Sequence, residues 1–200
     1  MTDKQQSADP LDENAWVEAA LVLLAEGSIH KVGVEPLAKQ LGVTKGSFYW
    51  HFKDRAALHD GMLRAWKRRA TLAIIERLEH GAVSTVDRLQ QMIDLPYHSP
   101  KSFAAARVEL AIRAWARSDK RAANAVAEVD EQRLTYLTGL FRRIGYDELD
   151  ASVRAYLVYS YMISESLIVT GTTQNNQKML DARRARAREI LIGTASRRAS

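Results

Sequence analysis

The chain has 200 residues with 29 Lys and Arg against 24 Asp and Glu, so its net charge of +5 is too modest to identify a partner class by itself. It contains no Cys, which excludes disulfides, thiolate metal sites and a Cys nucleophile, and its length suits one large domain or two modest ones. Residues 1–10 are polar and lack the apolar core of a secretory signal, so we expect a cytoplasmic protein.

The first predicted helix begins at Pro10 or Asp12 and ends at Glu26, before Gly27. Its apolar side chains recur at helical spacing and form one stripe. We expect this stripe to cover the two helices that follow. The stripe consists of Trp16, Ala19, Ala20, Leu23 and Leu24.

The segment 34–51 is typical of two short helices joined by a tight turn at Gly42, which supplies the positive φ that such turns often need. Thr44 then caps the second helix, and we expect its hydroxyl to accept a hydrogen bond from the Ser47 N–H. The apolar residues that would meet between the helices are Leu37, Leu41, Val43 and Phe48. This pattern predicts a helix-turn-helix over about residues 33–52, whose second helix enters the DNA major groove.

The second helix of this motif has two different faces. At about 100° per residue, Phe48 and Phe52 point inward together. The opposite face carries Gly46, Ser47, Tyr49, Trp50 and Lys53. The alternative is a stable helical hairpin with a few exposed aromatics, but bulky aromatics beside cations are costly on a surface that has no partner. We therefore favour DNA binding.

Positive charge is concentrated around this motif. Between Ser28 and Arg69, nine Lys and Arg stand against three Asp and Glu, a net charge of +6 in this segment. Such a concentration supplies the part of DNA affinity that does not depend on sequence. Its coincidence with the helix-turn-helix supports the DNA interpretation.

The motif resembles the DNA-binding domain of TetR-family transcriptional regulators. The resemblance runs through 37–38 and 41–53, extends back through 16–20 and 23–26 and forward through Ala57 and Leu58, and so covers about residues 10–70. It implies an all-α homodimer with an N-terminal three-helix DNA-binding domain and a C-terminal helical bundle for ligand binding and dimerisation. Carried over by position, the phosphate and base contacts of the family correspond to Thr44, Lys45, Ser47, Tyr49, His51, Lys53 and Arg55.

One position departs from the family. Members often carry a pair of Thr before the first helix of the motif, where this chain has Val32 and Gly33. Gly is still an acceptable cap, and Pro36 suits the first turn of a helix. The phosphate contact would then come from the backbone at Gly33 or Val34. The predicted DNA-binding residues are Gly33, Thr44, Lys45, Gly46, Ser47, Tyr49, Trp50, His51, Lys53 and Arg55.

The rest of the chain is predicted to be helical. Asp54 is expected to cap one long helix that continues to Gly81, and another start signal lies at residues 84–87. Further helices are expected at about 101–117, 119–144, from Asp147 or Asp150 to about 170, and 177–192. The expected domains are a flexible tail (1–9), the DNA-binding domain (10–70), a regulatory and dimerisation domain (71–193) and a basic tail (194–200).

The predicted helix 150–170 is apolar on more than one face, so it is either central to a core or shared between subunits. Its longest apolar segment, 155–169, is interrupted by Ser160, Ser164 and Glu165 and is too short to span a bilayer. In the TetR family the last two long helices usually build the dimer interface. The predicted interface residues are Val153, Leu157, Ser160, Tyr161, Ser164 and Ile168.

An effector pocket is harder to locate. Pockets are mostly apolar with a few placed polar groups, but aromatic and Met residues at helical spacing are more often ordinary core. Glu109 and Arg113, four residues apart, are expected to form an ion pair. The candidate lining residues are Met62, Trp66, Met92, Phe103, Arg107, Leu110, Trp115, Tyr136, Leu140, Tyr159 and Met162.

These features favour a ligand-responsive repressor that binds a palindromic operator as a homodimer and needs no cofactor. The five His have no metal-ligand spacing, and the sequence lacks H-E-x-x-H, P-loop and G-x-S-x-G motifs, so we predict no catalytic or metal site. A helical module that binds protein is disfavoured by the basic, aromatic second helix. A DNA-binding regulator that activates transcription, or that answers to a protein partner rather than a small molecule, remains an alternative.

Overall fold

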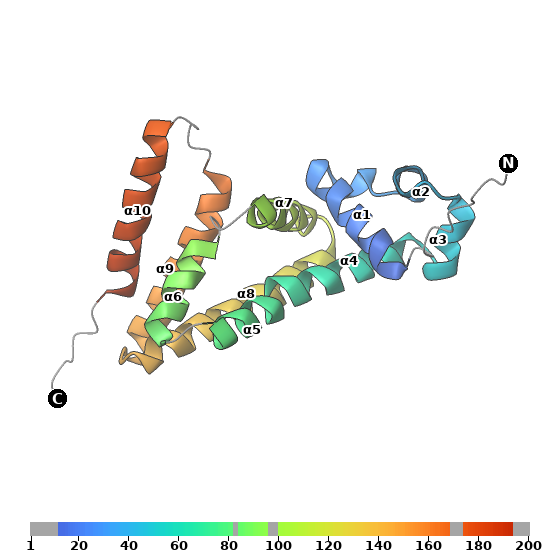
Figure 1. Cartoon of the computed structure of the whole chain (residues 1–200). Helices are drawn as coiled ribbons and strands as arrows, with labels where there is room; N and C mark the ends of the chain where they lie inside the picture. Colours follow the sequence, from blue (N-terminus) through green and yellow to red (C-terminus); the bar gives the residue numbers. More distant parts are fainter. Residues whose placement is uncertain (1–11, 82–83, 96–99, 169–173, 194–200) are drawn as a thin grey trace.

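The computed structural model describes residues 12–81, 84–95, 100–168 and 174–193, and every regular element in these ranges is a helix (Figure 1). The fold class predicted from the sequence, all-α with an N-terminal helix-turn-helix, is confirmed. The helices are α1 (Glu13–Glu26), η1 (Ile29–Lys31, a 3₁₀ turn), α2 (Val34–Leu41), α3 (Lys45–His51), α4 (Arg55–Ala70), α5 (Leu72–Gly81), α6 (Thr85–Asp94), α7 (Pro100–Trp115), α8 (Lys120–Arg143), α9 (Glu148–Leu167) and α10 (Gln174–Ile192).

Short acidic and hydroxyl side chains set where five of these helices begin. Asp54 accepts a hydrogen bond from the Ala57 N–H at 2.8 Å, as expected of the cap of α4. Ser84 and Asp87 form a reciprocal capping box at the start of α6, which confirms the start signal there. Three further helices have aspartate caps, which are Asp12 for α1, Asp119 for α8 and Asp147 for α9.

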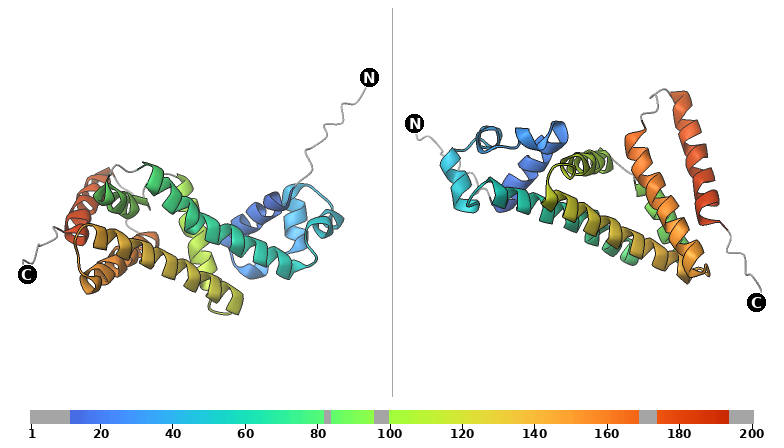
Figure 2. Two further views of the ribbon diagram at one scale, coloured as in Figure 1. Left: turned by 90° about the horizontal axis from the view of Figure 1, so that it is seen from below. Right: turned by 180° about the vertical axis from the view of Figure 1, so that it is seen from behind.

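The molecule is elongated, with α1, α2 and α3 at one end and α6, α9 and α10 at the other (Figures 1 and 2). Helices α4 and α5 follow one another from the first end toward the second, and α8 runs alongside them. Helix α7 lies across the middle and packs on α1. We call α1 to α4 the head. None of the helices in the described ranges has the length and hydropathy needed to cross a bilayer.

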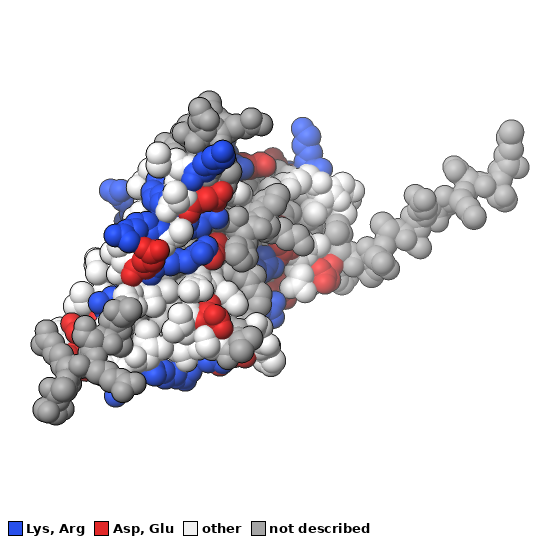
Figure 3. Space-filling view, turned by 60° about the vertical axis from the view of Figure 1, so that its left-hand side comes forward, with Lys and Arg blue, Asp and Glu red and all other residues white. Residues whose placement is uncertain are grey.

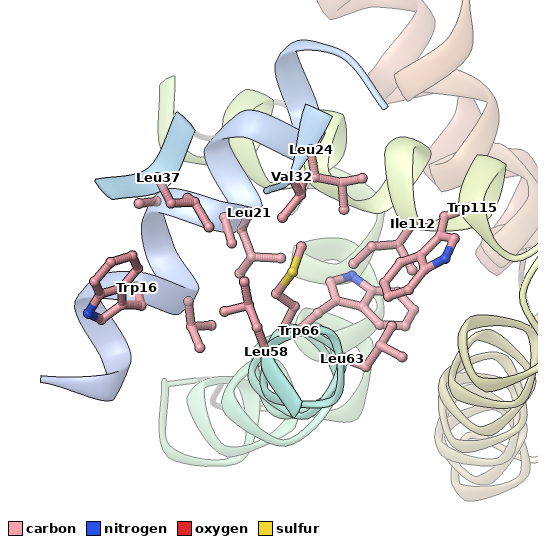
Figure 4. Close-up of a cluster of buried hydrophobic side chains, with 14 of the residues drawn as sticks. Trp16, Leu21, Leu24, Val32, Leu37, Leu58, Leu63, Trp66, Ile112 and Trp115 are labelled. Atoms are coloured by element: carbon pink, nitrogen blue, oxygen red, sulfur yellow. The ribbon is translucent and has the colours of Figure 1, made fainter. Parts of the chain in front are cut away.

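The first hydrophobic core joins the head to α7 and to the first half of α8 (Figure 4). Leu21, Leu58 and Trp66 of the head share this core with Ile112 and Trp115 of α7. Burial of apolar area at about 25 cal/mol per Å² makes such a shared core the main attachment of the head. The division predicted at residue 70 therefore coincides with a break between helices, whereas the packing of the head continues into α7 and α8.

The second hydrophobic core lies at the other end of the molecule. It is formed by α5, α6, the second half of α8, α9 and the end of α10. Its most deeply buried members include Leu78, Leu89, Ile93, Leu137 and Phe141. Helix α8 is the element that enters both cores, because Val129 belongs to the first and Leu137 to the second.

The prediction of one helix from Asp54 to Gly81 is wrong, because the chain breaks at Thr71 between α4 and α5. The Thr71 hydroxyl donates to the Lys67 carbonyl at 2.6 Å, and the Thr71 N–H donates to the same oxygen. A Thr that bonds back to the preceding turn often bends a helix. This local contact separates the end of α4 from the start of α5.

Two ion pairs connect α10 to neighbouring helices. Arg183 pairs with Glu165 of α9 at 2.8 Å, and Arg188 pairs with Asp94 of α6 at 2.7 Å. On this side of the molecule basic and acidic side chains alternate (Figure 3). Although arginines interrupt the apolar stripe of this helix in the sequence, two of them, Arg183 and Arg188, thus contact the rest of the fold.

Candidate nucleic-acid interface

The turn between α2 and α3 has the conformation predicted for a helix-turn-helix. Gly42 has φ +68° and ψ +29°, and its N–H donates to the carbonyls of the last turn of α2. A Cβ built on Gly42 would meet no atom within 4 Å, so the left-handed backbone rather than space favours glycine here. The Val43 N–H donates to the Ala38 carbonyl at 2.9 Å and closes the turn.

Phe48 holds α3 against the head. Its ring is fully buried and lies edge-on to Trp16 of α1, with centroids 5.4 Å apart, and stacked on Phe52, with centroids 5.3 Å apart. These contacts fix the rotation of α3 about its own axis. The opposite side of the helix must therefore face away from the protein.

That outward side carries two large aromatics. Trp50 is 88% exposed and Tyr49 is 62% exposed, whereas Phe48 between them and the core is not exposed at all. Lys45, Gly46 and Lys53 are exposed on the same end of the head, and Ser47 and His51 are partly exposed. A convex rod with exposed aromatics, hydroxyls and cations has the shape and chemistry to enter a DNA groove.

Two of the predicted DNA-binding cations also have partners within the head. Lys45 forms an ion pair with Glu35 of α2, and the hydrogen bond and charge of Lys45 lower the pKa of Glu35. Arg55 donates from Nη2 to the Ile29 carbonyl at 2.6 Å and so ties α4 to the 3₁₀ turn. Both pairs are exposed, so DNA phosphates are free to compete for either cation.

The cap of α3 differs from the prediction. Thr44 is the N-cap residue, but its hydroxyl does not accept the expected hydrogen bond. The Ser47 N–H donates instead to the Thr44 backbone carbonyl at 3.1 Å. The Thr44 side chain is exposed and forms no cap hydrogen bond with the helix.

Gly33 is the N-cap of α2 and supplies no side-chain hydrogen bond, as its lack of a side chain requires. Val32 before it is fully buried. Neither Val32 nor Gly33 carries the hydroxyl that the family often has at these two positions. A surface hollow of about 500 Å³ lies beside this helix start and is lined in part by His30, Lys31 and Gly33. The backbone of α2 is thereby exposed to a ligand at its positive end.

The residues predicted to line an effector pocket are divided between the two cores and the surface. Met62 and Trp66 belong to the first core, and Met92 and Tyr159 to the second. Tyr136 and Met162 pack against the second core, Leu110 is partly buried, and Phe103 and Arg107 lie exposed on α7. None of these nine residues lines the hollow beside α2 or a second hollow of about 400 Å³ around His59. Of the two further candidates, Leu140 is buried in the second core and Trp115 borders the second hollow.

A charged network lies between the two cores, with two buried members (Arg133 and Tyr159) and three partly buried ones (Glu109, Arg113 and Asp130). The ion pair predicted between Glu109 and Arg113 is present at 2.9 Å. Arg133 also binds Glu109, at 2.8 Å, and Asp130 binds Arg113 at 2.6 Å. The sequence analysis missed Asp130 and Arg133, although they stand three residues apart on one helix, as ion-pairing residues often do.

Hydrogen bonds and charges within this network shift the pKa values of its members. Burial alone would raise the pKa of Glu109, but the guanidiniums of Arg133 and Arg113 outweigh it and lower that pKa. The pKa of Asp130 is lowered despite burial by Arg113 and by the Tyr159 hydroxyl, which donates to it. Burial raises the pKa of Tyr159 to about 12. Both carboxylates are therefore ionised and matched by two arginines at neutral pH.

His59 on α4 is buried where the head meets α7. It is 8% exposed, its ring lies edge-on to Trp115 with centroids 5.0 Å apart, and its Nε2 has no hydrogen-bond partner. Its pKa is lowered to about 4. Burial is the largest cause, the charges of Arg55 and Arg121 also lower the pKa, and those of Asp119 and Asp60 raise it by less. The imidazole is therefore neutral at pH 7.

We expect His59→Phe to make folding less sensitive to acid. Between pH 6.5 and about 4 the unfolded chain binds a proton at His59 that the folded protein does not, so the free energy of unfolding of the native chain falls as the pH decreases through this range. The stability of His59→Phe relative to the native protein should be about 2 kcal/mol more favourable at pH 5 than at pH 7.5. Urea denaturation at the two pH values measures this difference, and an equal difference at both would contradict the assignment.

An exposed apolar surface runs along α9. Val153, Leu157 and Ile168 of the predicted dimer interface are exposed, as are Leu149 and Tyr156 beside them. Ser160, Tyr161 and Ser164, the other predicted members, are partly buried. We call Leu149, Val153, Tyr156 and Leu157 the α9 face. Contiguous apolar surfaces of this kind usually mark an interaction site.

Comparisons with known proteins bear on the head and the whole fold separately. Residues 17–61 match the family described as bacterial regulatory proteins, tetR family. The class A tetracycline repressor protein from transposon 1721 of Escherichia coli is 38% identical over 55 residues, which are 28% of this chain and 26% of the repressor. The chain thus matches about a quarter of the length of that curated relative.

The whole fold is similar to those of solved regulators. A transcriptional regulator from Rhodococcus sp. Rha1 has a TM-score of 0.71 and 21% identity, over 92% of this chain and 95% of that one. A regulator from Saccharomonospora viridis in complex with choline has a TM-score of 0.68 and 16% identity, over 90% and 92%. FadR from Bacillus subtilis in complex with stearoyl-CoA has a TM-score of 0.64 and 21% identity, over 92% and 99%.

The family match coincides with the helices whose geometry forms the helix-turn-helix. The structural similarity extends over the rest of the chain, α5 to α10, which we call the body. The chain therefore carries the N-terminal domain of the TetR family of bacterial regulatory proteins, and its whole fold is similar to those of solved transcriptional regulators.

Proposed function

We propose that this protein binds double-stranded DNA through α3 and regulates transcription in the bacterial cytoplasm. The observation that carries the proposal is the exposure of Tyr49 and Trp50 on a helix whose other side is anchored by buried Phe48. Aromatic and hydroxyl side chains would contact sugars, phosphates and base edges, and Lys53 would neutralise phosphates. Gly33 at the start of α2 would offer backbone N–H groups to a phosphate.

A homodimer would present two such helices to a palindromic operator. The α9 face supports this assembly because it is apolar, exposed and far from the head. A two-fold dimer formed through α9 would leave both heads accessible. Binding through two heads raises the affinity without any new kind of contact.

We further propose that the protein is a repressor that responds to a small molecule bound in the body. Two structural neighbours are complexes with small molecules, choline in one and stearoyl-CoA in the other. A ligand can shift the heads only by its difference in affinity for two states of the body. An activator, or a regulator controlled by a protein partner, would use the same head, and the promoter fragments retained by the protein from its own genome would distinguish these roles.

A salt titration tests DNA binding. The affinity for a fluorescent 30-base-pair duplex should fall linearly with the logarithm of salt concentration, with a slope of about −0.9 per neutralised phosphate. Lys53→Ala should reduce the slope by about 1 for each phosphate that it loses. The control Lys178→Ala removes an exposed cation of α10 and should leave the slope unchanged.

The competing function is a helical module that binds proteins. It predicts weak DNA binding with no effect of Lys53→Ala. At 50 mM salt the affinity of a protein with about six phosphate contacts is about a thousandfold higher than at 200 mM. If the native protein did not bind the duplex at 50 mM salt, the proposal would be contradicted.

A further inference from the structure

Besides the shared first core, polar contacts between α4 and α8 connect the head to the rest of the protein. The two helices run side by side (Figure 2) and are joined at three levels. Arg121 of α8 pairs with Asp60 at 3.1 Å, Glu128 pairs with Lys67 at 2.6 Å, and Arg133 donates from Nε to the Ala70 carbonyl at 2.9 Å. The first two pairs are largely exposed, and exposed ion pairs contribute little.

The third contact is buried. Arg133 is 8% exposed, and Ala70 is the last residue of α4, where backbone carbonyls lose their intrahelical partners. A guanidinium at this position satisfies the Ala70 carbonyl and interacts favourably with the negative end of the helix dipole. The contact lies next to Thr71, where α4 separates from α5.

Arg133 is itself held in place by residues of α7 and α9. Its two Nη atoms donate to the two carboxylate oxygens of Glu109 at 2.8 and 2.9 Å, and Nη1 also donates to the Tyr159 hydroxyl at 3.0 Å. The guanidinium lies over the Tyr159 ring, 5.5 Å from its centroid. Tyr159 belongs to α9 and packs in the second core. One planar group therefore connects α4, α7, α8 and α9.

We propose that Arg133 is a positioning residue, which fixes the end of α4, and with it the head, relative to the second core. The inference rests on the proposed DNA-binding function, because only then does the position of the head govern affinity. It goes beyond that function by naming the contact through which a change around α9 would reach α3.

The geometry of the guanidinium is essential to this role. Five N–H groups in one plane allow Nε to reach the Ala70 carbonyl while the Nη atoms hold both oxygens of Glu109. A Lys keeps the charge beside Glu109, but its single ammonium cannot occupy both positions. Arg133→Lys therefore separates the positioning role from the charge balance of the network.

The first test measures the position of the head directly, without DNA. The chain has no Cys, so Gln40→Cys on α2 and Thr135→Cys on α8 give unique sites for spin labels, and both positions are exposed. Dilution with unlabelled protein limits the signal to distances within one chain. The native distance distribution should be narrow, and Arg133→Lys should at least double its width.

The second test is DNA affinity at a temperature where each variant is fully folded. Arg133→Lys should weaken binding about tenfold. The control Leu137→Ala removes a fully buried side chain one turn further along α8, so it lowers the melting temperature without touching α4, and its affinity should stay within twofold of native. If Arg133→Lys failed to fold, Tyr159→Phe, which removes one hydrogen bond to Arg133, should give the same broadening to a smaller extent.

A distribution as narrow as native in Arg133→Lys, or a broadened one with native affinity, would overturn the inference. Equal losses of affinity in Arg133→Lys and Leu137→Ala would also overturn it, because stability alone would then account for both. If the native protein itself failed to bind DNA, the proposed function would fail, and the distance measurement would still decide whether Arg133 positions the head.

Discussion

Trp50→Ala and Tyr49→Ala should each weaken DNA binding by about 1–3 kcal/mol while leaving the melting temperature unchanged. Both side chains are exposed in the free protein, and the edge-on contact of the Tyr49 ring with Phe48, with centroids 5.2 Å apart, is the main packing lost when they are removed. Their contribution would arise in the complex, where an aromatic ring lies against sugars or a thymine methyl and the tyrosine hydroxyl donates to phosphate or a base edge. Fluorescence anisotropy at fixed salt measures the affinity, and thermal denaturation measures the stability.

A matched control separates this effect from the general loss of an exposed apolar side chain. Leu72→Ala on α5 removes such a side chain, 55% exposed, outside the head, and its affinity should equal that of the native protein. Native affinity in both Trp50→Ala and Tyr49→Ala would show that α3 does not contact DNA. A fall in melting temperature in either variant would show instead that the head had been disturbed.

Leu157→Glu should convert the proposed dimer into monomers. Leu157 is 48% exposed in the middle of the α9 face, so the isolated chain tolerates a carboxylate there. In a two-fold interface one substitution places two charges in the contact, where burial without a partner and mutual repulsion together cost several kcal/mol. The dimer dissociation constant should rise at least 100-fold, and analytical ultracentrifugation measures it.

Loss of the dimer should also weaken operator binding, because each monomer then engages a single half-site. Leu72→Glu is the control, since it introduces the same charge at an exposed apolar position of α5. It should leave both the dimer and DNA binding intact. A Leu157→Glu protein that stays dimeric would place the interface elsewhere on the chain.

The outcome for the head illustrates what local sequence can specify. Gly42 at a left-handed turn, Asp54 as a cap and Phe48 on the inner face were all predicted, because each depends on backbone conformation or periodicity within a few residues. The prediction of a hydroxyl cap at Thr44 was wrong, because the Thr44 backbone carbonyl rather than its hydroxyl accepts a hydrogen bond from the Ser47 N–H. The prediction of an unbroken helix through Thr71 was wrong, because the Thr71 hydroxyl bonds back to the preceding turn although the helical pattern continues on both sides.

In the body, by contrast, local pattern was a poor guide to role. Aromatic and Met residues such as Trp66, Met92 and Tyr159 have the same helical spacing whether they line a pocket or fill a core, and the structure divides them between two cores. The arginines of α10 interrupt its apolar stripe in the sequence, yet Arg183 and Arg188 attach the helix to α9 and α6. Their partners are 18 and 94 residues away in the chain.

The sequence by itself determined the helical fold class, the helix-turn-helix and the outward aromatic surface of α3, because periodicity, caps and turn conformation act over a few residues. Only the tertiary structure showed that the head shares its core with α7 and α8, and that Arg133 reaches the Ala70 carbonyl 63 residues away. A buried guanidinium is stable only where carboxylates and carbonyls from several helices converge on it. That convergence is a property of packing, which no local pattern records.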